Sequence, residues 1–262
     1  MVGGAGMKQT TGSVLLLAAV LANSAVLAAG SSAPSGQVTA VDEPDQHTEA
    51  FLGVDANSTG SFFGYTLFRL APEKGGLDES GLRFWLPGGA GFYHYPRDDE
   101  KIRGTFWATD ALVGYNLERD DLSAAIYVGL NSQDHQLSVP DPENRVQGAQ
   151  VGAKFRADAW YNPTPATLLF GEGEYSTAFG TYWTSGKYGY SITGGKTLED
   201  QQLYIGPQIT LFGNERYQEW RIGAHITSFS LGKLDFEIGA GFQHNTDNGS
   251  GAYGIVEFNT KF

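Results

Sequence analysis

The stretch Tyr217–Phe229, YQEWRIGAHITSF, alternates apolar and polar side chains along most of its length. One face carries the apolar residues Trp220, Ile222, Ala224 and Ile226, and the other carries Glu219, Arg221, Gly223, His225 and Thr227. Successive side chains of a β-strand point to opposite faces, so this pattern predicts a strand with one apolar face.

The same alternation recurs to the last residue, and no stretch between Ala50 and Phe262 shows a helical period. The segments run up to about 16 residues, whereas strands of soluble proteins average about five or six and membrane-spanning strands about 9 to 11. We therefore predict an all-β fold, a closed antiparallel up-and-down transmembrane β-barrel of about 12 strands. Ten strands follow if residues 166–193 do not form two. The predicted strands are 50–58, 61–71, 81–94, 104–118, 122–133, 146–161, 166–177, 182–193, 201–212, 216–230, 233–244 and 251–262.

Composition narrows the class further. The chain of 262 residues has no Cys, 36 Gly, 16 Phe, 13 Tyr and 5 Trp, and 17 Lys+Arg against 29 Asp+Glu give a net charge of −12. This acidity disfavours nucleic-acid binding, and the missing Cys excludes disulfide scaffolds and thiolate sites. A mean hydropathy of −0.26 excludes a bundle of membrane helices.

The N-terminal region reads as an export signal. Lys8 precedes the apolar run from Val14 to Ala22, and small residues follow up to Ala28. This order predicts a cleaved signal peptide over residues 1–28, with Met1 or Met7 as the true start. Residues 29–49, with two Pro and no large apolar residue, predict a flexible periplasmic arm, and residues 50–262 the outer-membrane barrel domain.

Three further patterns fit a barrel with a periplasmic N-terminus. Short inner turns are expected at 119–121, 162–165 and 231–233 and longer outer loops at 95–103, 132–145 and 245–250, with 71–80 as an exception. Phe262, with Phe258 on the same face, is similar to the signal that the barrel assembly machinery recognises. Aromatic residues near segment ends predict two girdles at the headgroups: Phe62, Phe63, Tyr93, Tyr95, Phe106, Trp107, Tyr115, Trp160, Tyr161, Tyr182, Trp183, Phe212, Tyr217 and Trp220.

No motif carries catalytic chemistry. The five His show no zinc-binding spacing, and neither a nucleophile elbow nor a phosphate loop is present. We therefore expect no enzyme activity, cofactor or metal. The loop at 134–145 is expected to be a capped surface loop, with weak calcium binding as the alternative. The inward face holds charges of both signs, which predict ion-pair networks in the lumen: Asp110, Asn116, Lys154, Arg156, Asp158, Glu172, Glu174, Glu219, Arg221, His225, Glu237, Glu257 and Lys261.

Short motifs along nearly the whole mature chain resemble the bacterial cellulose biosynthesis protein BcsS family. They include Phe51-Leu52-Gly53, Tyr65, Gly81-Leu82-Arg83, Gly91-Phe92-Tyr93-His94-Tyr95, Leu112-Val113-Gly114-Tyr115, Tyr127-Val128-Gly129, Asp141-Pro142-Glu143-Asn144 with Gly148 and Gly152, Trp160, Tyr175-Ser176-Thr177-Ala178-Phe179, Gly206-Pro207, Gly213-Asn214, Arg221-Ile222-Gly223-Ala224-His225 and Tyr253-Gly254. The resemblance implies a role in cellulose assembly or export at the outer membrane of a Gram-negative bacterium, and it brings no catalytic residues.

The resemblance implies a neutral glucan as the ligand, which stacking and hydrogen bonds would guide. The expected lumen or glucan contacts are Tyr127, Tyr217, Phe106, Arg221, His225, Lys154, Arg156 and Glu219. The expected partners are outer-membrane lipid, the cellulose chain, cellulose synthase or export subunits and the assembly machinery. A general small porin or structural barrel, a lipid-modifying barrel enzyme and a secreted carbohydrate-binding β-sandwich are the alternatives. The sequence leaves open whether the barrel conducts, its oligomeric state and whether it touches cellulose directly.

Overall fold

The computed structural model describes residues 45–98, 100–194 and 202–262. The predicted signal peptide and most of the predicted arm lie outside the described residues. Strand β1 begins at Thr48, two residues before the predicted start of the barrel domain.

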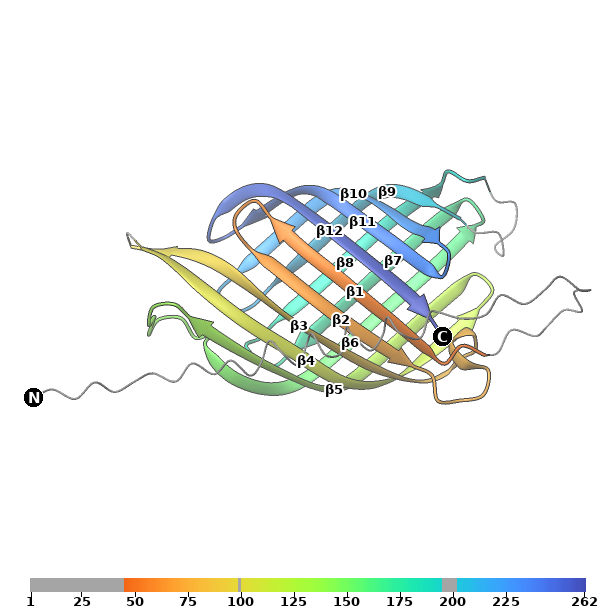
Figure 1. Ribbon diagram of the computed structural model, residues 1–262, viewed down its shortest axis with the longest axis horizontal. Helices are drawn as coiled ribbons and strands as arrows, with labels where there is room; N and C mark the ends of the chain where they lie inside the picture. Colours follow the sequence, from red (N-terminus) through yellow and green to blue (C-terminus); the bar gives the residue numbers. More distant parts are fainter. Residues whose placement is uncertain (1–44, 99, 195–201) are drawn as a thin grey trace, which may run out of the picture. The chain divides into compact units, whose positions relative to one another are not determined.

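Twelve antiparallel strands follow one another around a closed barrel, as predicted (Figure 1). Each strand pairs with its neighbours in the chain, and β1 pairs with β12 to close the sheet. A closed barrel has no free edge, so the secreted β-sandwich is wrong. The strands are β1 Thr48–Asn57, β2 Phe62–Leu70, β3 Gly81–Arg97, β4 Glu100–Arg119, β5 Leu122–Leu137, β6 Gly148–Thr164, β7 Thr167–Ser176, β8 Tyr182–Ser191, β9 Tyr204–Gly213, β10 Gln218–Leu231, β11 Leu234–Asn245 and β12 Gly249–Lys261.

The seam between β1 and β12 is fully paired. Leu52 lies opposite Phe258, and Thr48 and Phe262 exchange backbone hydrogen bonds of 2.9 and 2.8 Å. Phe258 also pairs with Phe236 of β11, and their ring centroids are 6.0 Å apart. Phe262 itself is exposed, and the assembly signal stays a prediction for this residue and Phe258.

The two faces of the barrel wall differ in polarity. Large apolar side chains are exposed on the outside, with Val151 and Ile126 at 70% and 68% exposure. Charged and amide side chains are buried on the inside, among them Arg221, His225 and Gln243. No helix in the described ranges is long and apolar enough to cross a membrane. An apolar outside around a polar inside is the arrangement of a barrel whose solvent is lipid.

Chain topology defines two ends. The proximal end carries the start of β1, the end of β12 and the connection 71–80. The distal end carries the end of β3, the start of β4 and the connections 58–61, 138–147, 177–181, 214–217 and 246–248. The outer loop predicted at 95–103 is wrong, because Tyr95 and Ile102 are paired within a continuous β3–β4 hairpin. Residues 132–137 likewise continue β5, so only 138–147 remains a long distal connection. Loop lengths therefore do not alternate as expected.

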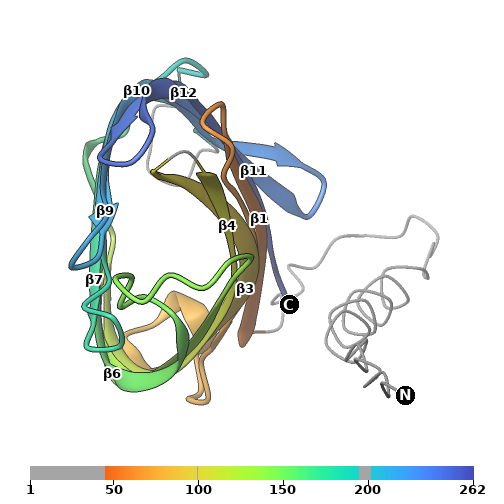
Figure 2. The ribbon, with the colours of Figure 1, turned by 90° about the vertical axis from the view of Figure 1, so that its left-hand side faces the viewer.

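The proximal connection 71–80 folds against the inside of the barrel, and Figure 2 shows it in light orange within the outline of the strands. It contains the short 3-10 helix η1, Gly76–Asp78, whose Leu77 is buried. The Arg83 guanidinium donates to the carbonyl oxygen of Leu77 at 3.2 Å and also to that of Glu79. Arg83, 1% exposed, thereby fastens this connection to β3.

The predicted aromatic girdles are correct in part. Phe62, Trp107, Tyr115, Tyr161 and Trp220 are exposed on the outer face. The other predicted members, apart from Tyr182, alternate onto the inner face and contact lumen residues: Phe63, Tyr93, Tyr95, Phe106, Trp160, Trp183, Phe212 and Tyr217. Position near a strand end does not distinguish outward-facing from inward-facing rings, because successive side chains of a strand point to opposite faces.

Candidate functional site

The lumen has two unlike walls. The inner faces of β1–β5 carry the aromatic wall, which we define as Phe51, Phe63, Tyr65, Trp85, Tyr93, Tyr95, Phe106 and Tyr127. The inner faces of β6–β11 carry the charged wall, which we define as Lys154, Arg156, Asp158, Glu172, Glu174, Lys187, Glu219, Arg221 and Glu237. The barrel thus combines apolar rings and paired charges in one lumen.

Rings of the aromatic wall contact one another across four strands. Phe63 lies 5.4 Å from Phe106 with ring planes 17° apart, and Phe106 lies 5.3 Å from His135 at 10°. Tyr65 joins Phe63 at 5.4 Å, and Tyr93 joins Phe106 at 6.1 Å. Aromatic pairs at these centroid distances attract one another, so this part of the wall is a continuous packed surface.

Glycines on neighbouring strands make room for these rings. A Cβ on Gly114 would lie 2.4 Å from Cδ1 of Tyr127, and one on Gly53 would lie 2.3 Å from Cζ of Tyr65. Tyr127 is the cross-strand partner of Gly114, and Tyr65 is that of Gly53. Each ring therefore covers the lumen side of a glycine that no other residue could replace without moving the ring.

The proximal part of the aromatic wall is a buried cluster. Trp85 packs on Tyr127 and Phe51 at centroid distances of 5.4 and 6.5 Å, and Leu112 packs beside them. The guanidinium of Arg156 lies 4.3 Å from the Trp85 ring. Because Arg156 belongs to β6 and Trp85 to β3, this contact joins the two walls.

Ion pairs cover the charged wall. Lys154 contacts Asp110 at 2.6 Å and Glu174 at 2.8 Å. Arg156 contacts Glu172 at 2.5 Å, Glu174 at 3.3 Å and Asp158 at 3.3 Å. Two cations therefore share the Glu174 carboxylate, and each carboxylate in the group faces a cation. This group was predicted from the sequence as a lumen network, and the structure confirms its pairing.

Two further groups extend the network. Arg221 of β10 donates to Glu219 at 2.6 Å and pairs with Asp55 of β1, while Tyr217 donates its hydroxyl proton to Glu219. Lys187 of β8 pairs with Glu237 of β11. The Arg221–Asp55 and Lys187–Glu237 pairs each join strands that are not neighbours in the sheet, so these side chains span part of the lumen.

His225 is linked to the Lys187–Glu237 pair through Thr227, whose hydroxyl donates to Glu237 at 3.1 Å. The His225 ring is hydrogen-bonded to the Tyr188 carbonyl oxygen at 3.0 Å and to the Thr227 hydroxyl at 2.8 Å, and it is 1% exposed. Both ring nitrogens are thus occupied by neighbouring groups. In the described part of the chain, no group of three or more His, Asp or Glu is placed to hold a metal ion.

The distal end of the lumen is covered by residues 138–147, which we call the mouth loop; Figure 2 shows it in green, crossing the barrel opening. Its Asp141 carboxylate accepts from the Tyr95 hydroxyl at 2.9 Å, pairs with Arg97 at 2.6 Å and lies 3.8 Å from Arg216. Asn144 donates to the Tyr95 hydroxyl at 3.0 Å. The loop is thereby fastened to β3 and to the β9–β10 turn.

The electrostatics of Asp141 favour this closed arrangement. Burial alone would raise the pKa of Asp141, but hydrogen bonds from Tyr95 and the Glu143 amide, with Arg97 and Arg216 nearby, bring that pKa below its usual value. The side chain has 0% exposure. The loop predicted at 134–145 therefore begins later than expected, because residues 134–137 continue β5, and protein cations neutralise its Asp141.

The predicted contact residues fall into separate places. Phe106 and Tyr127 belong to the aromatic wall, Lys154 and Arg156 meet at Glu174, and Tyr217, Glu219 and Arg221 form one group near the distal end. His225 touches none of them. Sequence reasoning missed Asp141, because a carboxylate in a Pro-containing stretch gives no sign that the loop folds inward.

A protein-family model matches the barrel region of the chain. The model described as "Cellulose biosynthesis protein BcsS" matches residues 50–262. The curated proteins contain no match.

Solved structures with similar shape are bacterial barrels. LpxR from Salmonella typhimurium has TM-score 0.48 at 10% identity, covering 82% of this chain and 100% of that one. OprB of Pseudomonas putida has TM-score 0.37 at 8% identity, covering 83% and 92%. The β domain of the Bordetella autotransporter BrkA has TM-score 0.38 at 13% identity, covering 83% and 100%. Identities this low say nothing about activity.

Proposed function

The chain belongs to the cellulose biosynthesis protein BcsS family, and from this premise we propose that it is a non-enzymatic outer-membrane barrel that serves cellulose secretion by contacting the glucan along its aromatic wall. The outer-membrane location is supported by the closed barrel with its apolar outer face. A signal peptide removed near Ala28 would bring the chain to that membrane through the barrel assembly machinery. Cellulose synthase or export subunits are the proposed partners.

The observation that carries the proposal is the packed row of rings from Tyr65 through Phe63 and Phe106 to His135. A neutral glucan has no charge for a protein to attract, so ring packing and hydrogen bonds must supply its affinity. The described cations of the charged wall all pair with carboxylates, so that wall offers hydrogen-bonding groups without a free cation. Aromatic faces beside paired charges suit a neutral, hydroxyl-rich chain.

We propose a non-enzymatic role because the candidate acid and base side chains are already bound to other groups of the protein. Glu172 and Glu174, which could act as paired carboxylates, are both bound to Arg156. His225 is held by the Tyr188 carbonyl and Thr227. A general acid or base has to reach a substrate with its proton-carrying atom, and these atoms already have protein partners.

The test compares neighbouring rings of β4 that face opposite ways. Phe106→Ala removes a ring of the aromatic wall, and Trp107→Ala removes an exposed ring of the outer face. We expect Phe106→Ala to lower glucan affinity two- to tenfold, the equivalent of about 0.5–1.5 kcal/mol per ring pair, and to lower secreted cellulose. Trp107→Ala should leave secretion unchanged, and boiling-dependent gel migration should show that both barrels assemble.

Combination with Tyr127→Ala and Tyr217→Ala should deepen the loss. Cellulose yield that stays at the wild-type level in Phe106→Ala, with the barrel assembled, would remove the glucan-contact proposal.

A second candidate, a structural barrel that assists the export machinery, is favoured by the covered distal end and the ion pairs across the lumen. One outcome distinguishes this candidate from the glucan-contact proposal. For a structural barrel, deletion of the gene would abolish cellulose secretion, while substitutions in the lumen would not.

A further inference from the structure

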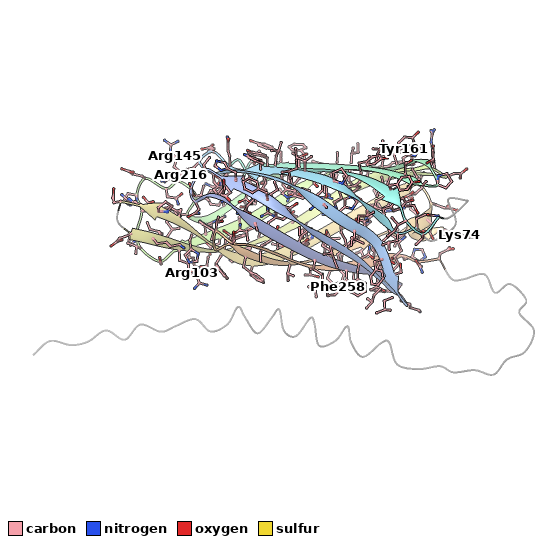
Figure 3. All side chains as sticks on the ribbon, turned by 90° about the horizontal axis from the view of Figure 1, so that it is seen from above. Lys74, Arg103, Arg145, Tyr161, Arg216 and Phe258 are labelled. Carbon is pink, nitrogen blue, oxygen red and sulfur yellow. The ribbon has the colours of Figure 1, made fainter. Side chains whose placement is uncertain are left out.

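A cluster of basic side chains lies on the outer face of the β3–β4 hairpin near the distal end. His94 of β3 is the cross-strand partner of Arg103 of β4, and Pro96 is the partner of Lys101. Alternation along β4 puts Lys101 and Arg103 on the same face as the exposed Trp107. Figure 3 shows Arg103 pointing away from the barrel. These three groups, His94, Lys101 and Arg103, form what we call the distal basic cluster.

Contacts hold the cluster over an aromatic base. The Arg103 guanidinium carbon lies 4.4 Å from the centroid of the Phe92 ring, and Phe92 stacks on Phe62 at 5.9 Å and 22°. His94 Nδ1 donates to the Gly60 carbonyl oxygen at 2.7 Å, which ties the side chain to the β1–β2 turn. A Cβ on Gly60 would lie 3.3 Å from that His94 nitrogen and 3.8 Å from Lys101 Nζ, so both groups sit over the same residue.

The cluster makes no ion pair within residues 45–98, 100–194 and 202–262. Among the ion pairs of the described residues none involves His94, Lys101 or Arg103, and Lys101 and Arg103 are both exposed. Like charges side by side on one face of a sheet repel each other. In a chain of net charge −12, two adjacent cations without an ion-pair partner among the described residues are a local feature that can attract an anion.

The height of the cluster matches a lipid headgroup. The exposed outer residues of β4 include Trp107, Val113 and Tyr115, which mark the apolar band, and Arg103 lies four residues beyond Trp107. At ~3.3 Å per residue and a tilt of about 45°, this is about 9 Å along the membrane normal. Aromatic girdles lie at the headgroup boundary, so the cations stand at the level of phosphate groups.

We propose that the distal basic cluster binds the phosphate of a phosphorylated lipid in the adjoining leaflet. The Arg103 fork and the Lys101 ammonium would hold the phosphate oxygens by charge-assisted hydrogen bonds. The exposed Phe62, with the half-buried Phe92 stacked on it, lies directly below and would pack against the acyl chain. A free phosphate would use only the cations, whereas a lipid uses the rings as well, so the lipid is the ligand that the whole cluster fits.

The experiment titrates the full detergent-purified barrel with bisphosphorylated lipid A and with the dephosphorylated lipid, and counts bound lipids by native mass spectrometry. Lys101→Gln with Arg103→Gln should weaken binding of the phosphorylated lipid about tenfold, with little effect on the dephosphorylated one. The matched control is Lys74→Gln with Lys233→Gln, which removes two exposed cations elsewhere on the barrel. It should bind lipid like the wild type.

A second variant separates lipid from free phosphate. Phe62→Ala with Phe92→Ala should weaken lipid binding while leaving any competition by inorganic phosphate unchanged. Equal losses in the two cation variants, or equal affinity for the phosphorylated and dephosphorylated lipids, would overturn the proposal. Cellulose yield plays no part in these readouts, so the glucan proposal can fail without affecting this one.

Discussion

At the scale of single residues, Gly114 shows how the aromatic wall depends on missing side chains. A Cβ there would lie 2.1 Å from the Ile126 carbonyl oxygen and 2.4 Å from the Tyr127 ring. We expect Gly114→Val to lower the free energy of unfolding by about 1–3 kcal/mol, the usual cost of overpacking. Gly171→Val is the control, since nothing lies within 4 Å of its Cβ position. Thermal loss of the folded band in detergent gels measures both, and equal stability of the two variants contradicts the argument.

Asp141 carries the second prediction at this scale. Asp141→Asn removes the charge that binds Arg97 and Arg216, so the mouth loop should exchange amide hydrogens and be cut by added protease several-fold faster. Glu143→Gln makes the same charge change at an exposed position of the loop and should behave like the wild type. Equal protection of the loop in both variants would show that the carboxylate does not hold it.

The acid response of the mouth loop follows from the direction of the pKa of Asp141. A pKa lowered in the folded state means that the ion pair stabilises the loop at every pH above the ordinary carboxyl value of about 4. This stabilisation is lost only as the pH falls through the lowered pKa. Hydrogen exchange of residues 138–147 should therefore be constant from neutral pH to about 4 once corrected for intrinsic rates, and rise below it; a rise between pH 7 and 5 would contradict this.

The sequence predicted correctly which face of the barrel wall the charged side chains occupy, but it did not predict this for the aromatic rings. Alternation assigned Lys154, Arg156 and Glu174 to the lumen because a charge on a lipid-facing position is costly. The same reasoning cannot place Tyr93 or Trp107, since an aromatic ring suits both the headgroup region and a crowded lumen. Asp141 escaped prediction because its partners, Tyr95, Arg97 and Arg216, are distant in the sequence.

At the scale of elements, Arg156 joins β6 to β7 by two carboxylates and reaches Trp85 of β3. We expect Arg156→Met to lower the free energy of unfolding by about 3–5 kcal/mol, because Glu172 would lose its paired cation and Glu174 would keep only Lys154. Adding Glu172→Gln and Glu174→Gln should recover part of the loss. Denaturant unfolding in micelles measures the series, with the exposed Arg119→Met as control. A single variant as stable as the wild type would show that the network contributes nothing.

The sequence predicted the strands where apolar and polar side chains alternate. It did not predict the strand ends that continue beyond the apolar core of the membrane. Both strands of the weakest predicted pair, residues 166–193, are present as β7 and β8. The β3–β4 hairpin was underestimated because Tyr95–Arg103 contains Pro96 and several charges, which are typical of a loop. Cross-strand pairs such as His94 with Arg103 extend the hairpin nonetheless, since a strand at the level of the headgroups needs no apolar face.

At the scale of the whole molecule, the barrel is closed at its seam and covered at its distal end, yet its lumen is not completely filled. The side chains of Glu174 and Asp55 keep 24% and 22% exposure, so water reaches parts of the inner wall. Twelve strands lie between barrels that side chains fill, at about eight strands, and porins of 16 to 18 strands with an open channel. The mouth loop therefore decides whether the remaining space connects to the outside.

The conductance of the barrel tests this last step. We expect the wild-type barrel to pass little current in planar bilayers, because Asp141 holds the mouth loop across the lumen. Replacing residues 139–146 by a short Gly-Ser linker should raise the single-channel conductance severalfold, since it removes the cover and leaves the ion pairs of the charged wall in place. Asp141→Asn should give brief openings between the two levels. If the linker variant stays as closed as the wild type, side chains rather than the loop block the lumen, and the structural-barrel candidate becomes the better account of the family's role in cellulose biosynthesis.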